Sequence, residues 1–242
     1  MRRFVTFLCF LSFANFVRAQ ELTPAELLNR SIAFHDPDQN WENSKLEFVI
    51  KMESPDLASR TSRVIINNEK GDFALSMISR GRVIDYKVDG LDSCEIKIDY
   101  LQPTQQEADS LNLTPQRARR WRDYYGYLYG LPMKLKDKGT VMASEVIRTT
   151  FQGEEVLALK VNYEENVGKD VWYFYFHPGT YAMVGYRFYH DESINDGEYI
   201  ILSGIEVDKG IRIPKDRAWY TNAEDKLLGT DIMQAMEVTR YY

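Results

Sequence analysis

The stretch DVWYFYFHPGTYAMVGYRFYH, residues 170–190, is the most aromatic run in the chain, and it predicts a β-hairpin. Two runs rich in Trp, Tyr, Phe and Val flank a short segment in which Pro178 fixes φ and Gly179 tolerates a positive φ. The chain can therefore reverse at that segment, and the two runs can pair as antiparallel strands.

Alternation of side chains along a strand gives this hairpin an apolar face and an amphipathic face. Arg187 falls on the second face and indicates that this side meets water. The residues predicted to share the apolar face are Trp172, Phe174, Phe176, Val184, Tyr186 and Phe188.

Short alternating runs separated by turn residues continue this pattern on both sides of the hairpin, which is typical of an antiparallel meander. Together they predict a mainly β fold of about a dozen strands in one curved antiparallel sheet, a half-open β-barrel. The further strands are expected near residues 46–53, 62–68, 73–80, 83–89, 93–100, 143–151, 156–163, 197–207, 211–221 and 228–236.

Three helix starts interrupt the strand pattern. Thr23 and Thr104 are each followed three residues later by Glu, which makes a capping box, and Thr114 precedes Pro115. The first helix is an amphipathic flank, and the segment from Gln102 to Lys138 is a helical insertion expected to cover the concave face of the sheet. Its last helix carries four arginines among Trp121 and three tyrosines, until Gly126, Gly130 and Pro132 break the pattern.

Residues 1–19 have the features of a cleaved signal peptide: Arg2 and Arg3, then an apolar run, then Val17-Arg18-Ala19. The sequence therefore predicts export to the periplasm or the extracellular space, with residues 20–242 as a single β-rich domain. The apolar run is too short for a permanent membrane helix, and no later segment reaches the roughly 20 apolar residues required. No transmembrane segment is expected.

Charge and cysteine content exclude some classes of function. Removal of the signal peptide takes away three arginines and no acid, so the net charge falls from −6 to −9. Such a chain lacks the clustered positive charge that a nucleic-acid partner requires. Cys94 is the only cysteine after residue 19, which leaves no internal disulfide, and a single thiol is usually a small apolar residue.

No motif in the sequence specifies a reaction. There is no Gly-x-Ser-x-Gly, and none of the three histidines has the spacing of a metal site. We therefore expect no catalytic residue, no metal and no cofactor. The richest polar cluster, His190, Asp191 and Glu192, is typical of a turn, and a metal-assisted hydrolase that uses it is an alternative.

The apolar face of the sheet has to be covered, because an exposed patch of that size would aggregate. If the sheet curls without filling its interior, the face lines an apolar cavity suited to small amphiphiles. The alternative is a filled core in a protein that serves as an interaction module of the cell envelope. The cavity candidates are Trp172, Phe174, Phe176, Tyr186, Phe188 and Trp121, and the head-group candidates are Arg119 and Arg122.

The order of elements, with Trp172-x-x-x-Phe176-x-Pro178-x-Thr180 opening a hairpin, resembles the LolA/LolB-like fold of the lipoprotein-localisation factors. The chain is still more similar to an uncharacterised family of exported bacterial proteins with this fold. The similarity lies in three short sequence motifs, Tyr125-Gly126-Tyr127, Gly130-Leu131-Pro132 and Gly168-Lys169-Asp170-Val171-Trp172. The resemblance implies a half-open barrel that wraps around helices and holds lipid acyl chains.

Taken together, these features predict an exported, non-enzymatic protein whose partner is a lipid or another amphiphile.

Overall fold

The computed structural model describes residues 22–79 and 81–241, so the predicted signal peptide lies outside the described residues. They form three α-helices, α1 (Pro24–His35), α2 (Gln105–Leu111) and α3 (Pro115–Gly130), with short 3₁₀ turns η1 (Trp41–Asn43), η2 (Met133–Lys136) and η3 (Glu192–Ile194). The strands are β1 (Ser44–Glu53), β2 (Arg60–Asn67), β3 (Asp72–Ser79), β4 (Arg82–Val88), β5 (Cys94–Ile98), β6 (Thr140–Met142), β7 (Ile147–Phe151), β8 (Glu154–Tyr163), β9 (Val171–Phe176), β10 (Met183–Tyr189), β11 (Glu198–Asp208), β12 (Ile211–Thr221) and β13 (Leu227–Arg240).

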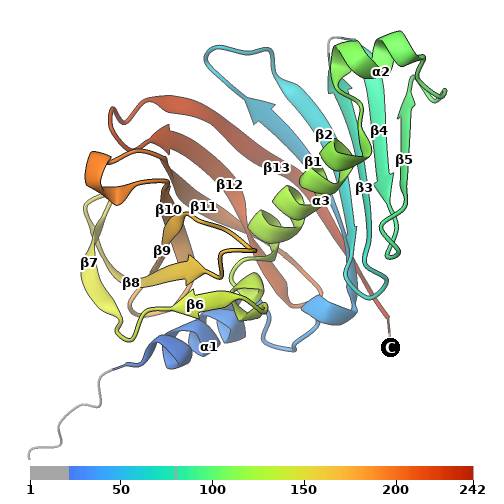
Figure 1. Cartoon of the computed structure of the whole chain (residues 1–242). Coiled ribbons are helices and arrows are strands. Elements are labelled where there is room, and N and C mark those ends of the chain that lie inside the picture. The colour runs from blue at the N-terminus through green and yellow to red at the C-terminus, as the bar shows by residue number, and fades with distance from the viewer. Residues whose placement is uncertain (1–21, 80, 242) are drawn as a thin grey trace, which may run out of the picture.

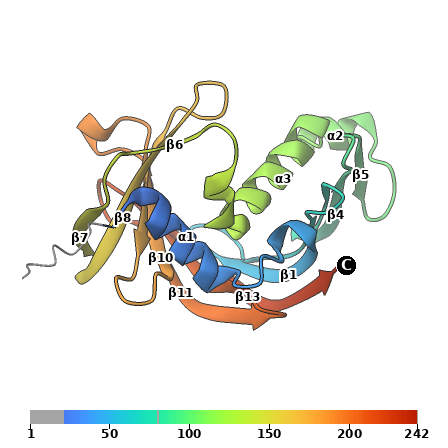
Figure 2. The ribbon, with the colours of Figure 1, turned by 90° about the horizontal axis from the view of Figure 1, so that it is seen from below.

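All the described strands belong to one antiparallel sheet of the order β5-β4-β3-β2-β1-β13-β12-β11-β10-β9-β8-β6, with β7 added on β8. The first and last strands of the chain pair at the middle of this order, where Ser44 lies opposite Arg240. The two ends of the order do not pair with each other, so the sheet is an open, curved half-barrel. Figures 1 and 2 show it wrapped around α1 and α3. The predicted fold class is confirmed.

The predicted helix starts are confirmed in atomic detail. Thr23 and Glu26 form a reciprocal capping box at α1, and Thr104 and Glu107 form a second one at α2. Thr114 caps α3 through its side chain, and Pro115 occupies the first turn. A side-chain cap satisfies backbone N–H groups that have no partner within the helix, which explains why these helices begin where they do.

The end of α3 corrects one expectation. Gly126 does not break the helix, which continues to Gly130. A Cβ atom added at Gly126 would meet no atom within 4 Å, so this position faces open space. The missing side chain leaves room there without interrupting the backbone hydrogen bonds.

The aromatic hairpin forms as β9 and β10, with Phe174 opposite Tyr186 and Trp172 opposite Phe188. A β-bulge between Met183 and Gly185 corrects the predicted face of Val184. Met183 lies opposite Phe176 on the inner side, and Val184 packs with the outer cluster. A bulge inserts one unpaired residue into a strand, so alternation fails at that point.

Two apolar clusters form the core. The larger one joins the concave face of the sheet to α1 and α3, through residues such as Leu27, Leu28, Tyr125 and Tyr129. The smaller one lies on the other face of the hairpin, where Phe151 stacks on Tyr175 with ring centres 4.3 Å apart. The helices therefore bury the concave face, as the sequence pattern predicts. Within the described residues, no helix is long and apolar enough to span a bilayer.

Candidate functional site

The inner face of the hairpin divides into a buried part and a partly exposed part. Phe174, Phe176 and Tyr186 have no exposed surface. The rings of Phe174 and Tyr186 lie 6.1 Å apart and pack into the main core. Behind these three residues the space is filled by neighbouring side chains.

Trp172 and Phe188 are only partly buried, at the end of the hairpin away from its turn. Their ring centres lie 4.9 Å apart, and Trp172 meets Tyr127 of α3 edge to face at 5.8 Å. The hydroxyl of Tyr127 hydrogen-bonds to that of Tyr163 at the end of β8. Burial raises the pKa of Tyr163 to about 12, so both phenols are neutral near pH 7.

A groove with a volume of about 700 Å³ lies beside these rings, between α3, the turn from β2 to β3, and the segment from β8 to β9. Its aromatic walls come from Trp172, Tyr127, Tyr163, Trp41 and Phe73, and its charged residues include Arg122, Asp123 and Lys134. Roughly 300–1,000 Å³ is the usual range for small-molecule sites, which commonly have apolar walls and a few polar groups. We call this the α3 groove.

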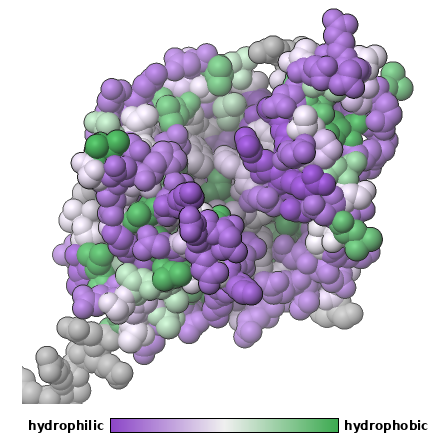
Figure 3. All heavy atoms as spheres, viewed as in Figure 1, coloured by the Kyte–Doolittle hydropathy of each residue, from purple (hydrophilic) through white to green (hydrophobic). Residues whose placement is uncertain are grey.

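The face that carries α3 is mostly hydrophilic, with small separate hydrophobic patches (Figure 3). The same view shows a recess near the middle of the face. This face therefore displays no single large apolar patch.

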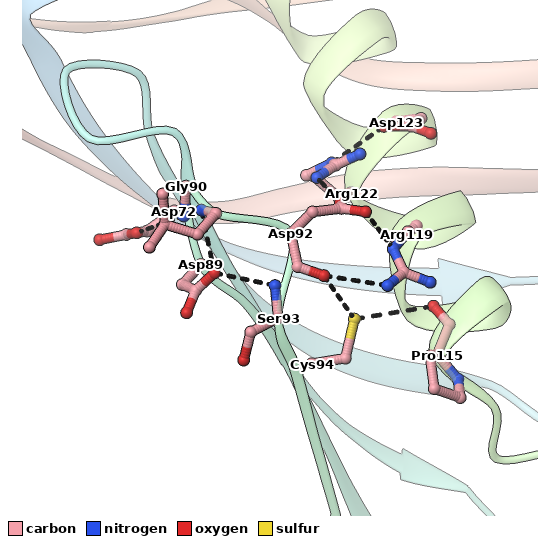
Figure 4. Close-up of polar contacts among 11 residues, drawn as sticks. Asp72, Asp89, Gly90, Asp92, Ser93, Cys94, Pro115, Arg119, Arg122 and Asp123 are labelled. Atoms are coloured by element: carbon pink, nitrogen blue, oxygen red, sulfur yellow. Dashed lines mark hydrogen bonds and ion pairs between the residues drawn. The ribbon is translucent and has the colours of Figure 1, made fainter.

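The predicted head-group residues Arg119 and Arg122 both bind Asp92 in the turn between β4 and β5 (Figure 4). Arg119 Nε donates to Asp92 Oδ2 at 2.5 Å, and Arg122 Nη1 donates to Asp92 Oδ1 at 2.7 Å. Both hydrogen bonds lower the pKa of Asp92, and the one from Arg122 has the larger effect. The two arginines thus fasten the start of α3 to the sheet, and only Arg122 also lines the α3 groove.

Trp121 lies apart from the hairpin. Its ring stacks on Tyr125 at 5.8 Å, and the guanidinium of Arg60 lies 5.4 Å from its centre. Of the eight predicted site residues, the structure brings Trp172 and Arg122 into the α3 groove.

The sequence reasoning did not single out Trp41, Phe73, Tyr127 and Tyr163 as a set, because they come from four separate segments. The one available signal was the aromatic content of the helix that carries Tyr127.

The cluster of His190, Asp191 and Glu192 does not converge. His190 Nδ1 lies 2.7 Å from Asp170, Asp191 caps η3 through Ser193, and Glu192 accepts from Lys160 at 2.8 Å and from Tyr173 at 2.6 Å. In the described ranges, no group of three or more His, Cys, Asp or Glu side chains is placed to hold a metal ion.

The model of a family of unknown function, DUF6503, matches residues 1–235. A search of curated proteins gives no match.

Among solved structures, a LolA superfamily protein from Nitrosomonas europaea is similar, with a TM-score of 0.51, 9% identity, and coverage of 91% of this chain and 95% of that one. A putative outer-membrane lipoprotein-sorting protein domain from Vibrio parahaemolyticus is similar with a TM-score of 0.49 and 10% identity. The match covers 89% of this chain and 93% of that one. A DUF1329 family protein from Desulfovibrio piger is similar with a TM-score of 0.44 and 12% identity, and the match covers 91% of this chain and 93% of that one. The first of these similarities shows that the chain has a LolA-like fold.

Proposed function

This chain belongs to the DUF6503 family of unknown function, and we propose that it is a non-enzymatic carrier that binds a lipid or another amphiphile in the α3 groove. The observation that carries the proposal is the groove itself, about 700 Å³ in volume, with Trp172 and Tyr127 in its wall. The LolA-like fold supports it, because the similar structure from Nitrosomonas europaea is a LolA superfamily protein.

Binding in this groove would use apolar burial together with a polar rim. Each square ångström of apolar surface removed from water contributes about 25 cal/mol. The rings of Trp172 and Tyr127 meet edge to face and remain partly accessible, so an acyl chain can cover them without unfolding the core. The charged groove residues are Arg122, Lys134, Glu42, Asp72, Asp123, Asp137 and Asp170. Both bases already form ion pairs, Arg122 with Asp92 and Asp123 and Lys134 with Asp137, so a head group here would bind beside these pairs.

We propose also that the carrier is exported, through a signal peptide cleaved after residue 19, and that residues 20–242 are a single LolA/LolB-like domain. The features of residues 1–19 support this. N-terminal sequencing of the protein recovered from expressing cells tests the cleavage site. A first residue of Gln20 is expected, and recovery of Met1 in the mature fraction contradicts it.

The carrier proposal is tested by native mass spectrometry and lipid extraction of the purified mature protein, together with titration of an environment-sensitive hydrophobic dye. A co-purifying amphiphile, or saturable dye binding at a ratio of about one to one, is expected. Absence of both contradicts the proposal.

A second candidate, an envelope interaction module, is favoured by one specific observation: Phe174, Phe176 and Tyr186 are completely buried in a filled core. Under this alternative the α3 groove binds no amphiphile, and the protein acts through a partner at its outer surface. The dye titration separates the two, because an interaction module has no saturable apolar site.

A further inference from the structure

The charges along the α3 groove are mostly negative. Two basic and five acidic side chains line it, which gives a net charge of −3 when all seven groups are ionised. A cleft lined mainly by one sign of charge attracts groups of the opposite sign, and the low-dielectric walls strengthen this attraction. The balance of charge therefore favours a positively charged ligand group over a negative one.

Both bases of the groove are already paired with carboxylates. Arg122 Nη1 donates to Asp92 at 2.7 Å, and Arg122 Nε donates to Asp123 at 3.0 Å (Figure 4). Lys134 forms an ion pair with Asp137. A carboxylate or phosphate of a ligand would have to displace one of these partners or approach beside it. The two bases therefore offer little net attraction to an anionic head group.

Glu42 and Asp72 have no such partner. Within the described ranges, no Lys, Arg or His nitrogen lies within 4.0 Å of either carboxylate. Asp72 Oδ1 accepts a hydrogen bond of 3.1 Å from the backbone amide of Gly90, a neutral donor (Figure 4). Asp170 lies 2.7 Å from His190 Nδ1. The unpaired negative charge of the groove is therefore that of Glu42 and Asp72.

These two acids come from segments that are fastened to each other. Asn68 Nδ2 donates to the carbonyl of Trp41 at 2.8 Å, so η1, which carries Glu42, is held against the turn that leads to Asp72 at the start of β3. Trp41 and Phe73, the sequence neighbours of the two acids, also line the groove. This part of the groove therefore combines two carboxylates with aromatic rings.

Aromatic rings bind cations as well as acyl chains. An ammonium group near the face of Trp or Tyr is attracted by the quadrupole of the ring, and quaternary ammonium ligands are commonly bound in this way. The protein already has such a contact at a partly exposed ring, where Lys160 Nζ lies 5.1 Å from the ring centre of Tyr173. Trp172 and Tyr127 of the groove are likewise partly exposed. The rings and the unpaired carboxylates thus suit the same ligand, a cation with an apolar chain.

We infer that the α3 groove binds an amphiphile whose head group carries an ammonium group, with Glu42 and Asp72 as its counter-charges. The inference rests on the proposed function and names the class of amphiphile. The apolar chain covers Trp172 and Tyr127, and the ammonium group lies towards the two carboxylates. Because Glu42 is exposed and Asp72 is half-buried, dissolved salt screens this attraction and weakens the preference.

The experiment compares three amphiphiles with the same chain: dodecyltrimethylammonium, its uncharged near-isostere dodecyldimethylamine oxide, and dodecanoate. Each displaces a neutral hydrophobic dye from the mature protein, in mildly alkaline buffer and below the concentration at which micelles form. At low salt the ammonium compound is expected to bind about tenfold more tightly than dodecanoate, with the amine oxide between them. Added salt should reduce this ratio.

Two double variants locate the preference. Glu42→Gln/Asp72→Asn removes both charges and keeps an oxygen that can accept from Gly90, so the ratio of ammonium to carboxylate affinity should fall at least threefold, with amine oxide binding unchanged. Glu154→Gln/Glu224→Gln changes the net charge of the protein equally at two exposed positions outside the groove, and it should leave the ratio unchanged. If the first double variant does not fold, Glu42→Gln alone should show a smaller decrease.

The outcomes separate this inference from the carrier proposal. Equal binding of the three amphiphiles overturns the ammonium preference and leaves the carrier proposal standing. The same applies if both double variants, folded by circular dichroism, lower the ratio equally, since the preference then comes from net charge. Displacement of the dye by tetramethylammonium, which lacks the chain, would mean that the site binds free cations and that the inferred class is wrong. Absence of saturable binding by the dye and by all three amphiphiles overturns both proposals.

Discussion

The Nε2 atom of His35, at the end of α1, accepts a hydrogen bond of 3.0 Å from the backbone amide of Met183 at the start of β10. Its Nδ1 atom lies 2.7 Å from the carbonyl of Arg212 on β12, to which it donates. A neutral imidazole meets both needs, with one nitrogen as donor and the other as acceptor. His35 therefore joins α1 to two strands of the half-barrel, and only its neutral form can do so.

The first prediction concerns the pH dependence of stability. Burial lowers the pKa of His35 to about 4, below its ordinary value of 6.5. The unfolded chain therefore takes up the proton first, so this stabilisation is complete above pH 6.5 and is lost as the pH falls towards 4. The expected loss is about 3 kcal/mol. Urea unfolding between pH 7 and pH 4 measures it, and His35→Gln should show a smaller decrease over that range.

The pKa of His190 shifts in the opposite direction to that of His35, so its effect on stability has the opposite pH dependence. Its hydrogen bond to Asp170 raises its pKa, so its contribution is present below pH 6.5 and is lost as the pH rises through the folded value. His190→Gln should therefore leave the decrease between pH 6.5 and pH 4 in place. If His190→Gln removed that decrease and His35→Gln did not, the assignment to His35 would be wrong.

The second prediction uses Gly126, which lies inside α3 and faces the α3 groove. Gly126→Ala should stabilise the protein by about 0.5–1 kcal/mol, because Ala is the better helix former and its Cβ meets no atom. Gly126→Trp should fill the groove and lower the affinity for a hydrophobic dye at least tenfold, with the fold retained. Thermal unfolding and dye titration check the two variants, and full dye binding by a folded Gly126→Trp protein would place the ligand elsewhere.

The third prediction concerns Trp172. Replacing it by Ala removes a wall of the α3 groove and should weaken dye binding, with a matched control in Tyr173→Ala, the next residue along β9 on the other face. Side chains at consecutive strand positions point to opposite faces, so only the first variant alters the groove. Equal losses in the two variants would mean that the effect comes from the strand and not from the groove.

The fourth prediction concerns the attachment of α3. Asp92→Asn weakens the ion pairs to Arg119 and Arg122, so amide hydrogen exchange should speed up in a peptide from the first two turns of α3. Exposed ion pairs contribute little to global stability, so the melting temperature should change little. Asp123→Asn, which loses only the contact with the adjacent Arg122, is the control. Unchanged exchange in Asp92→Asn would show that apolar packing alone holds the helix start.

Local sequence rules predicted the elements well because their causes are local. The Thr23 and Thr104 caps depend on a Glu three residues away, and the inward Trp172 and Phe174 depend on simple alternation. The bulge at Val184 was missed because one unpaired residue leaves no trace in an alternating apolar run.

The site was less accessible to such rules, because it depends on contacts between distant segments. Tyr127 and Tyr163 meet only when α3 crosses the sheet, and Arg217 finds Tyr129 through a long-range contact. In the sequence, Arg217 looks like an ordinary polar residue on a strand. Its complete burial follows from the position of α3, which periodicity alone does not determine.

The most direct test of the carrier proposal is photo-crosslinking of the mature protein with a fatty acid that carries a diazirine on its chain, followed by peptide mapping. Adducts are expected on peptides that contain Tyr127 and Trp172, and Gly126→Trp should suppress them. Adducts confined to peptides of the outer face, around Tyr175 and Tyr199, or an equal yield from Gly126→Trp, would contradict binding in the α3 groove.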